Sequence, residues 1–357
     1  MDYELFISRA SPYSSKIVAM MGYAGMAHRI RIQNGLTRYA ILKRLTGQTM
    51  VPVLRRGRWA INDSTRIARY ILERSQRPLK PPKDTELLVW MIEDFADEWM
   101  VRWMVHSRWR HRDDADRVTD IIGRELTGAL PVGAKIVGRS VGRVLRRQMK
   151  AWGTRAENDR ALESSALRTL EALQAVLSQG PDYLFASHPT VADFAIYGAL
   201  AQYNADPTGR QRLHVYPAVR EYLQRLDGMA DRPPTVRIEE GHTRDLAQLQ
   251  PLFGEMLGTY WAAMIANYRA RLEGDGRGEM VAELIDGSYF RARVSGYLQG
   301  RLEAMLELVD KTYADRDPLF GDSGLRMERA FVDRVAELCE SEAGRQLLQQ
   351  FTHVGMH

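Results

Sequence analysis

A serine at a helix start could stabilise an anion. Ser11 stands directly before Pro12, where the short alternating segment Tyr3–Ser8 predicts a strand and the residues that follow predict a helix. A helix N-terminus carries positive partial charge, and a hydroxyl can donate a hydrogen bond to an anion. Ser11 could instead only cap the helix, as serine commonly does. Ser8 and Tyr13 offer the same donor chemistry nearby.

A second helix start could bind a carboxylate. Asn62, Asp63 and Ser64 form an N-cap cluster before a run of apolar residues at helical spacing. The amides of a helix N-terminus suit a carboxylate, the Ser64 hydroxyl can add a bond, and Asp63 could pair with an amino group. A plain capping pair would use the same two residues.

The aromatic-rich segment 86–109 predicts a long helix. Trp99, Trp103 and His106 fall on one face of it, with Arg102 nearby. Such a face could form the floor of a site for an aromatic or anionic molecule. Tryptophans at helical spacing also occur in ordinary core or dimer packing, which is the competing interpretation.

Carboxylates of the same segment bear on metal binding. They form two i, i+4 pairs, Glu93 with Asp97 and Asp94 with Glu98. We expect no metal site, because no Glu-x-x-His repeat occurs on a second helix. The expectation is a solvated face on which Glu98 pairs with Arg102.

Cysteine usage limits the redox chemistry. Cys339 is the one cysteine of the chain, so neither an internal disulfide nor a cysteine-cluster metal site is possible within it. Positions 11 and 14 are serines, and thiol–disulfide exchange needs a protein thiolate at the site. Thiol–disulfide reductase chemistry is therefore not expected at these positions.

Composition indicates a globular protein of two or three domains. The chain has 357 residues, of which 45% are hydrophobic and 27% charged, with a net charge of +5. Its charges are mostly interspersed, so nucleic acid is not an expected partner. The N-terminal segment lacks the pattern of a signal peptide, and no apolar stretch is long enough to span a membrane. We expect a cytoplasmic protein for which membrane contact is unusual.

Sequence character divides the chain into four parts. Residues 1–76 read as a small α/β unit, and 77–83 as a proline-rich linker. Residues 84–240 are predicted to be helical, with a basic, glycine-interrupted insert near 112–150. Its basic run could contact anionic lipid or substrate, although a solvated face is the default. Residues 241–357 form an extension of helices around a hairpin, which we expect to turn tightly at Asp286-Gly287 and to pack on the helical part.

The first 75 residues resemble the thioredoxin-like domain of the glutathione transferase superfamily. Three segments carry the resemblance: Ser11-Pro12-Tyr13-Ser14 after the first strand, Thr49-Met50-Val51-Pro52-Val53-Leu54, and Asp63-Ser64. Further on, Pro189-Thr190-Val191-Ala192-Asp193-Phe194 resembles the capping box of the family's helical domain. The resemblance covers about residues 1–230. It implies a thioredoxin-like α/β domain, then an all-α domain, to which this chain adds its mostly helical extension.

The resemblance also implies a site. Ser11 would be the catalytic serine that stabilises the glutathione thiolate. The main chain of Val51, before a cis Pro52, would bind the cysteinyl part of glutathione, and Asp63 with Ser64 the γ-glutamyl part. The acceptor substrate would lie against five further residues: Tyr13, Trp99, Arg102, Trp103 and His106.

The function implied is that of a serine-type glutathione transferase. Its co-substrate would be glutathione, and its acceptor a small hydrophobic or aromatic electrophile. Two alternatives stay open. A lyase or isomerase could use the same thiolate, and a non-catalytic, metaxin-like scaffold could use the same fold. The family also implies a homodimer, unless the extension occludes that interface.

Overall fold

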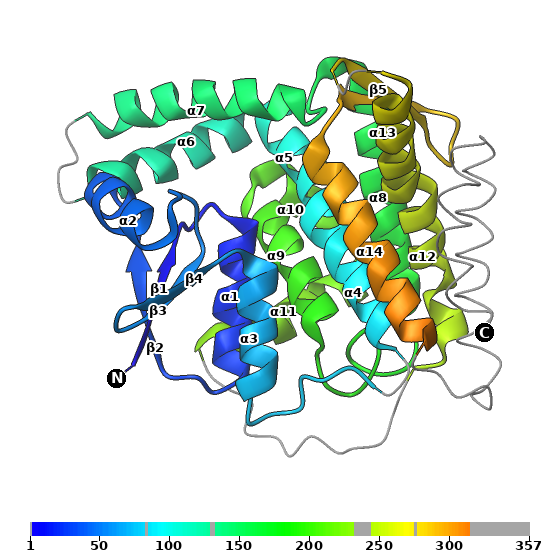
Figure 1. Ribbon diagram of the computed structural model, residues 1–357, viewed down its shortest axis with the longest axis horizontal. Coiled ribbons are helices and arrows are strands. Elements are labelled where there is room, and N and C mark those ends of the chain that lie inside the picture. Colours follow the sequence, from blue (N-terminus) through cyan, green and yellow to red (C-terminus); the bar gives the residue numbers. More distant parts are fainter. Residues whose placement is uncertain (1, 83–84, 129–132, 232–243, 275–276, 315–357) are drawn as a thin grey trace.

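The computed structural model describes residues 2–82, 85–128, 133–231, 244–274 and 277–314. Figure 1 shows an α/β part at the N-terminus, a bundle of helices beside it, and a helical hairpin that runs over both. No helix among the described residues is both long and apolar enough to cross a membrane.

The N-terminal part is a four-stranded sheet with helices, as expected. The strand order is β2-β1-β3-β4, with β1 parallel to β2 and antiparallel to β3. Helix α1 lies between the sheet and the helical bundle (Figure 1). The elements are β1 Tyr3–Ile7, α1 Pro12–Tyr23, β2 His28–Ile32, the π-turn Thr37–Leu42, α2 Lys43–Thr46, β3 Val53–Arg56, β4 Trp59–Asn62 and α3 Ser64–Arg74.

The helical part begins after the proline-rich segment. Helix α4 is buried along most of its length because its sequence is almost continuously apolar. The predicted capping box is confirmed at the start of α9, where the Asp193 carboxylate accepts the Thr190 amide at 2.7 Å. The helices are α4 Glu86–Phe95, a π-turn Ala96–Met100, α5 Val101–Arg110, α6 Arg112–Thr127, α7 Ala134–Ala151, the 3₁₀ turn Ala156–Asn158, α8 Asp159–Leu177, α9 Val191–Ala205, α10 Pro207–Leu213 and α11 Pro217–Asp231.

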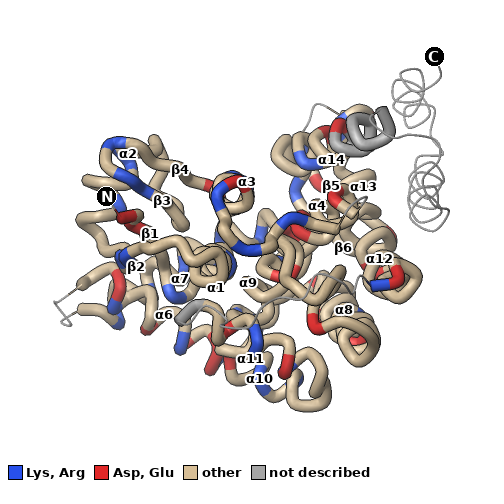
Figure 2. Tube along the Cα trace, turned by 90° about the horizontal axis from the view of Figure 1, so that it is seen from below, with Lys and Arg blue, Asp and Glu red and all other residues tan. Residues whose placement is uncertain are grey.

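Three of the five glycines of the insert, Gly123, Gly138 and Gly142, lie inside helices α6 and α7, and the other two cap the helix ends. A Cβ on Gly123 would lie 2.1 Å from the carbonyl oxygen of Ala134, and one on Gly138 would lie 2.0 Å from that of Thr119. The missing side chains therefore let the two helices approach closely. Helix α7 forms the outer layer in Figure 1. It carries basic residues without acidic ones, whereas the long helices α6, α8 and α14 carry both signs (Figure 2).

The described part of the extension packs on the helical bundle, as predicted. One continuous apolar core runs from Leu5 in β1 to Met305 in α14. A second predicted helix, over 326–351, lies outside the described residues. The elements are the 3₁₀ turn Leu246–Leu249, α12 Gln250–Met256, the π-turn Leu257–Trp261, α13 Ala262–Glu273, β5 Glu279–Glu283, β6 Tyr289–Arg293 and α14 Gly296–Ala314.

The hairpin β5–β6 is confirmed, but the expected tight primed turn is wrong. The loop is longer, because the Leu284 amide bonds to the Ser288 carbonyl at 2.8 Å and the Gly287 amide to the Leu284 carbonyl at 2.9 Å. Only Gly287 has a positive φ, of 70°, whereas a primed type I turn needs two such residues. The hairpin therefore has a three-residue loop with Gly287 in the left-handed conformation. An Asp-Gly sequence suits this kind of loop as well as it suits a primed turn.

Candidate functional site

Strand register brings three predicted segments to one edge of the sheet. Phe6 of β1 lies opposite Val53 of β3, and Val53 lies opposite Asn62 of β4. The chain therefore leaves β1, enters β3 and leaves β4 at the same edge. We call this the site edge: residues 8–11, 51–52 and 63–64. It contains Ser11, Val51-Pro52 and Asp63-Ser64, which the resemblance assigns to one site.

Ser11 caps helix α1 and keeps its hydroxyl hydrogen. Its backbone is extended, and its side-chain oxygen accepts the Ser14 amide at 3.2 Å. The bond uses a lone pair of the oxygen, and the structure records no acceptor for the hydroxyl hydrogen among the described residues. Capping and donation to a ligand are therefore compatible in one side chain.

The two alternative donors have already used their hydrogens. The Ser8 hydroxyl donates to Glu125 Oε2 at 2.7 Å, and the Tyr13 hydroxyl donates to the Asp97 carbonyl at 3.0 Å. Burial, followed by the charges of Glu98 and Asp97, raises the pKa of Tyr13 well above its usual value, so the phenol stays protonated. Of the three candidate hydroxyls, only that of Ser11 is available.

Two predicted binding residues have unusual backbones. The Val51–Pro52 peptide bond is cis, as expected. Asp63 has a φ of 77°, the one positive value for a non-glycine residue in the described chain. A non-glycine residue with a positive φ, such as Asp63, persists where the surrounding structure fixes it, and such residues gather at functional sites.

The start of α3 offers donors and a carboxylate. Asp63 is exposed, and its Oδ1 accepts the Arg66 amide at 3.0 Å. The amides of Ser64 and Thr65 belong to the first turn and have no partner within the helix. The Ser64 hydroxyl points inward and donates to Asp97 Oδ2 at 3.2 Å.

A buried ion triad below the site edge was not predicted. Lys16 of α1 is fully buried. Its Nζ atom lies 2.6 Å from Glu93 Oε1, in α4, and 2.7 Å from Asp97 Oδ2, in the turn Ala96–Met100. Burial alone would lower the pKa of Lys16, but Asp97 and Glu93 outweigh it and hold the pKa above its usual value. Burial raises the pKa of Asp97 to about 6. The triad fixes α1, and with it Ser11, against the helical part.

Glu125 is a second residue that sequence reasoning missed. Its carboxylate accepts the Ser8 hydroxyl and the Arg9 amide, both at 2.7 Å. Helix α6 thus docks on the loop that precedes Ser11. Glu125 lies more than 110 residues away from Arg9 in sequence. No local sequence pattern indicates that a glutamate of this helix contacts the loop before Ser11.

The predicted acceptor face lies in the core of the structure. Trp99 is fully buried and donates to Ser165 at 2.8 Å, and Trp103 packs edge-on against Tyr203 at 5.1 Å between ring centroids. His106 is 4% exposed and lies 3.1 Å from Asp159. Burial lowers the pKa of His106 despite that carboxylate. The burial of these three side chains agrees with the competing interpretation, in which they pack in the core.

The expectation of a solvated carboxylate face is wrong. Glu93, Asp94, Asp97 and Glu98 are each 5% exposed or less. Three segments cover them: α1 through Lys16, α3 through its serine and threonine hydroxyls, and α14. The expected Glu98–Arg102 pair is absent from the described ion pairs, and Glu98 accepts the Tyr297 hydroxyl at 2.6 Å instead.

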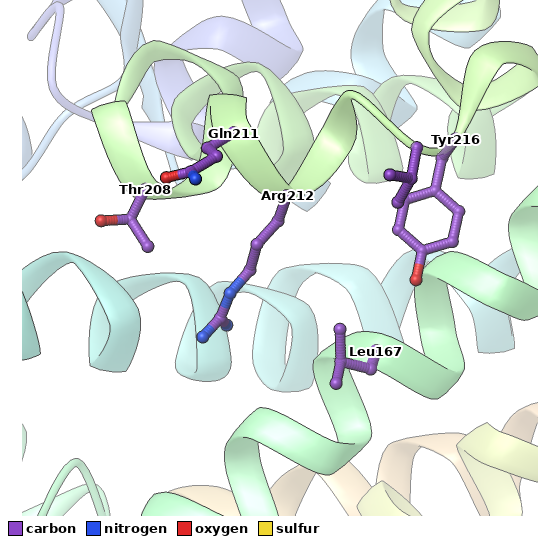
Figure 3. Close-up of a pocket in the computed structure, with 6 residues that line it drawn as sticks. Leu167, Thr208, Gln211, Arg212 and Tyr216 are labelled. Atoms are coloured by element: carbon purple, nitrogen blue, oxygen red, sulfur yellow. The ribbon is translucent and has the colours of Figure 1, made fainter.

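Two further features lie apart from this chemistry. A hollow of about 350 Å³ between α8 and α10 includes no predicted site residue (Figure 3). It is lined by Leu167, Thr208, Gln211, Arg212, Val215 and Tyr216. In the described part of the chain, no group of three or more His, Cys, Asp or Glu side chains could hold a metal ion.

Family models match both parts of the molecule. Residues 5–79 match the model of the glutathione S-transferase N-terminal domain, and residues 154–225 match that of the glutathione S-transferase C-terminal domain. No curated protein sequence matches the chain significantly.

Solved structures with a similar fold are distant in sequence. A GST-like protein from Pseudomonas syringae is 20% identical, with a TM-score of 0.47, over 65% of this chain and 68% of that one. The beta-etherase LigF from Sphingobium sp. is 14% identical, with a TM-score of 0.46, over 71% and 99%. A glutathione S-transferase from Methylobacterium radiotolerans, in complex with glutathione sulfonate, is 14% identical, with a TM-score of 0.42, over 68% and 100%.

Proposed function

This chain belongs to the glutathione S-transferase superfamily, and from that premise we propose that it binds glutathione as a thiolate beside Ser11 and directs the sulfur to a small electrophile. One observation carries the proposal. Among the three candidate hydroxyls of Ser8, Ser11 and Tyr13, that of Ser11 alone keeps a hydrogen to donate. It does so at the N-terminus of α1, where the helix dipole also favours negative charge.

The donor set of the site edge fits glutathione. The unpaired amides of Ser64 and Thr65 suit the α-carboxylate of the γ-glutamyl group. The exposed Asp63 carboxylate suits its ammonium group, and the main chain of Val51 would bind the cysteinyl part. These four residues, together with Ser11, would hold the peptide.

The chemistry required of the protein is modest. A free thiol has a pKa of about 8.5, so at neutral pH most of it is protonated. A hydrogen bond from Ser11 and the field of α1 both favour the thiolate, which is the nucleophile. In a substitution, the carbon–sulfur bond forms and the leaving group departs with its electron pair. The protein contributes orientation and charge stabilisation.

Replacing Ser11 tests this role. Ser11→Ala should raise the pKa of bound glutathione, read from thiolate absorbance across pH, by about one unit, because it removes one hydrogen bond to a charged atom worth about 1.4 kcal/mol. Turnover should fall, and raising the pH should partly restore it. Ser11→Cys should gain thiol exchange with glutathione and lose conjugation, since a cysteine at a helix start is acidic.

Ser8→Ala is the matched control. Its hydroxyl is bound to Glu125, so the variant should keep the wild-type pKa of bound glutathione. If both Ser11 variants keep the wild-type rate and pH profile, Ser11 acts only as a helix cap and the proposal is refuted.

We also propose that the protein is a homodimer, as the family implies. Light scattering should then give twice the 40.8 kDa mass of one chain. A monomeric mass at assay concentrations would reject this and would direct attention to the extension, which packs on the helical bundle.

A further inference from the structure

Arg102 is a buried cation without a partner. Its side chain is fully buried, and none of its Nε, Nη1 and Nη2 atoms has a hydrogen-bond partner in the described structure. A buried, uncompensated charge is costly, and each unsatisfied buried group calls for a physical explanation.

The other buried lysine and arginine side chains show how unusual this is. Within the described residues these are Lys16, Arg108 and Arg244. Lys16 contacts two carboxylates, and Arg108 contacts the Asp206 carboxylate and the oxygens of Gln202 and Ala10. Arg244 donates to several backbone carbonyls, among them that of Leu184 at 2.8 Å. The fold therefore provides hydrogen-bond acceptors for these three buried cations, whereas Arg102 has none in the described structure.

Glu98 is the carboxyl group with the largest electrostatic effect on Arg102, but the described structure has no hydrogen bond between them. Glu98, one helical turn earlier, bonds through Oε1 to Tyr297. Burial, followed by the charge of Asp94, raises the pKa of Glu98 to about 8, so this carboxyl is largely protonated at neutral pH. The guanidinium is left with a positive charge and five N–H donors to satisfy.

Aromatic rings surround the guanidinium. Its Cζ lies 5.4 Å from the ring centroid of Trp99, 5.5 Å from that of Trp152 and 5.4 Å from that of Phe290. Trp152 is half-buried, and Tyr297, which acts electrostatically on Arg102, is 54% exposed. Tyr13, two residues after Ser11, also interacts electrostatically with Arg102. The unpaired cation thus lies near the start of α1, among side chains that reach the surface.

We propose that Arg102 determines acceptor specificity by binding the carboxylate of a small aryl electrophile. A guanidinium fork matches a carboxylate through two parallel hydrogen bonds, and the surrounding rings suit a flat aromatic group. This inference rests on the proposed transferase function, since it names the substrate class of the same site. The probe reaction balances without a further reactant: the glutathione sulfur bonds to the ring carbon, and chloride leaves with the electron pair of the broken carbon–chlorine bond.

A matched pair of acceptors tests it. The probes are 4-chloro-3,5-dinitrobenzoate and its neutral carboxamide, each corrected for its uncatalysed rate with glutathione. The readout is the ratio of kcat/KM for the anion to that for the amide within each variant. Arg102→Met should lower this ratio about 10- to 100-fold, the scale of a hydrogen-bonded charge pair, and Arg102→Lys should lower it less. Arg110→Met, an exposed arginine on the same helix, should keep the wild-type ratio.

A binding measurement tests the same site without turnover. Without glutathione, benzoate should raise the melting temperature of the wild-type protein, whereas benzamide and acetate at the same concentration should not. Arg102→Met should melt no lower than wild type and should lose the benzoate effect. Equal effects of benzoate and benzamide would overturn the inference, as would an acetate effect as large as that of benzoate, or an unchanged kcat/KM ratio in Arg102→Met.

The two proposals fail differently. If glutathione does not bind but benzoate stabilises the wild type and not Arg102→Met, the transferase function fails and the carboxylate site stands. If glutathione binds and the amide is turned over while the ratio is insensitive to Arg102, the function stands and the specificity role fails.

Discussion

The hydroxyl hydrogen decides which serine of the site edge can donate a hydrogen bond to a ligand. Ser8 gives its hydrogen to Glu125 and Ser64 gives its hydrogen to Asp97, whereas Ser11 uses only its oxygen, as a helix cap. The residue types were evident from sequence, but these assignments were not. They depend on Glu125 and Asp97, which lie 117 and 33 residues away from their serines.

Ser64 can be tested against its own neighbour. Ser64→Ala should weaken glutathione binding about fivefold, the equivalent of one hydrogen bond of about 1 kcal/mol, because the Ser64 oxygen can accept from the ligand while it donates to Asp97. Thr65→Val is the control, since Thr65 also donates to the buried triad, at 2.7 Å to Glu93. Calorimetry should show near wild-type affinity for Thr65→Val. Equal losses in both variants would mean that the triad, rather than a contact with the ligand, sets the affinity.

At the scale of elements, the packing of helix α14 on α4 depends on buried acids. Arg301 pairs with Asp94, and Tyr297 donates to Glu98. Folding raises the pKa of Glu98 to about 8, from an ordinary value of about 4.5. The folded state therefore holds this proton more tightly than the unfolded state, and its stabilising effect is lost as pH rises towards 8.

The raised pKa of Glu98 predicts how the stability of the protein depends on pH. Wild-type unfolding free energy should fall between pH 6 and pH 9, by about 3 kcal/mol from Glu98. Glu98→Gln, which resembles the protonated acid, should lack that part of the decline in urea titrations at the two pH values. Glu303→Gln, an exposed position on α14, should decline like wild type. A decline in Glu98→Gln as large as that of wild type would contradict the assignment.

The β5–β6 hairpin gives a second prediction at this scale. Phe290 is fully buried and packs edge-on against Trp99 at 5.0 Å, whereas its neighbour Tyr289 is 54% exposed. Phe290→Ala should cost about 3–5 kcal/mol of stability, and Tyr289→Ala about 0.5 kcal/mol or less. Urea denaturation measures both. Equal small losses would show that the hairpin does not belong to the core.

Regular elements were predictable where the signal is local. Helix α8, Asp159–Leu177, lies within the part predicted to be helical, and the capping box and the hairpin occur where their motifs predict them. The solvated face was mispredicted because charges at i, i+4 spacing are typical of surfaces. Here α1, α3 and α14 converge on one helix and bury those charges, and no pattern within that helix reveals its neighbours.

At the scale of the molecule, the insert and the described part of the extension contact residues of the proposed site. Helix α6 brings Glu125 to the loop before Ser11, and the extension brings Phe290 and Tyr297 to the surroundings of Arg102. Both segments lie outside the two regions that match the family models. They are therefore where this chain could differ from its family in the acceptor that it takes.

Glutathione binding tests the central claim most directly. We predict that calorimetric titration of the full chain gives saturable binding to one site per chain, with a Kd in the millimolar range or below. Asp63→Asn should keep the N-cap but bind more weakly, because it loses the charge that faces the ligand's ammonium group. Absence of heat at millimolar glutathione, with the protein shown to be folded, would contradict the account and would favour a scaffold built on the same fold.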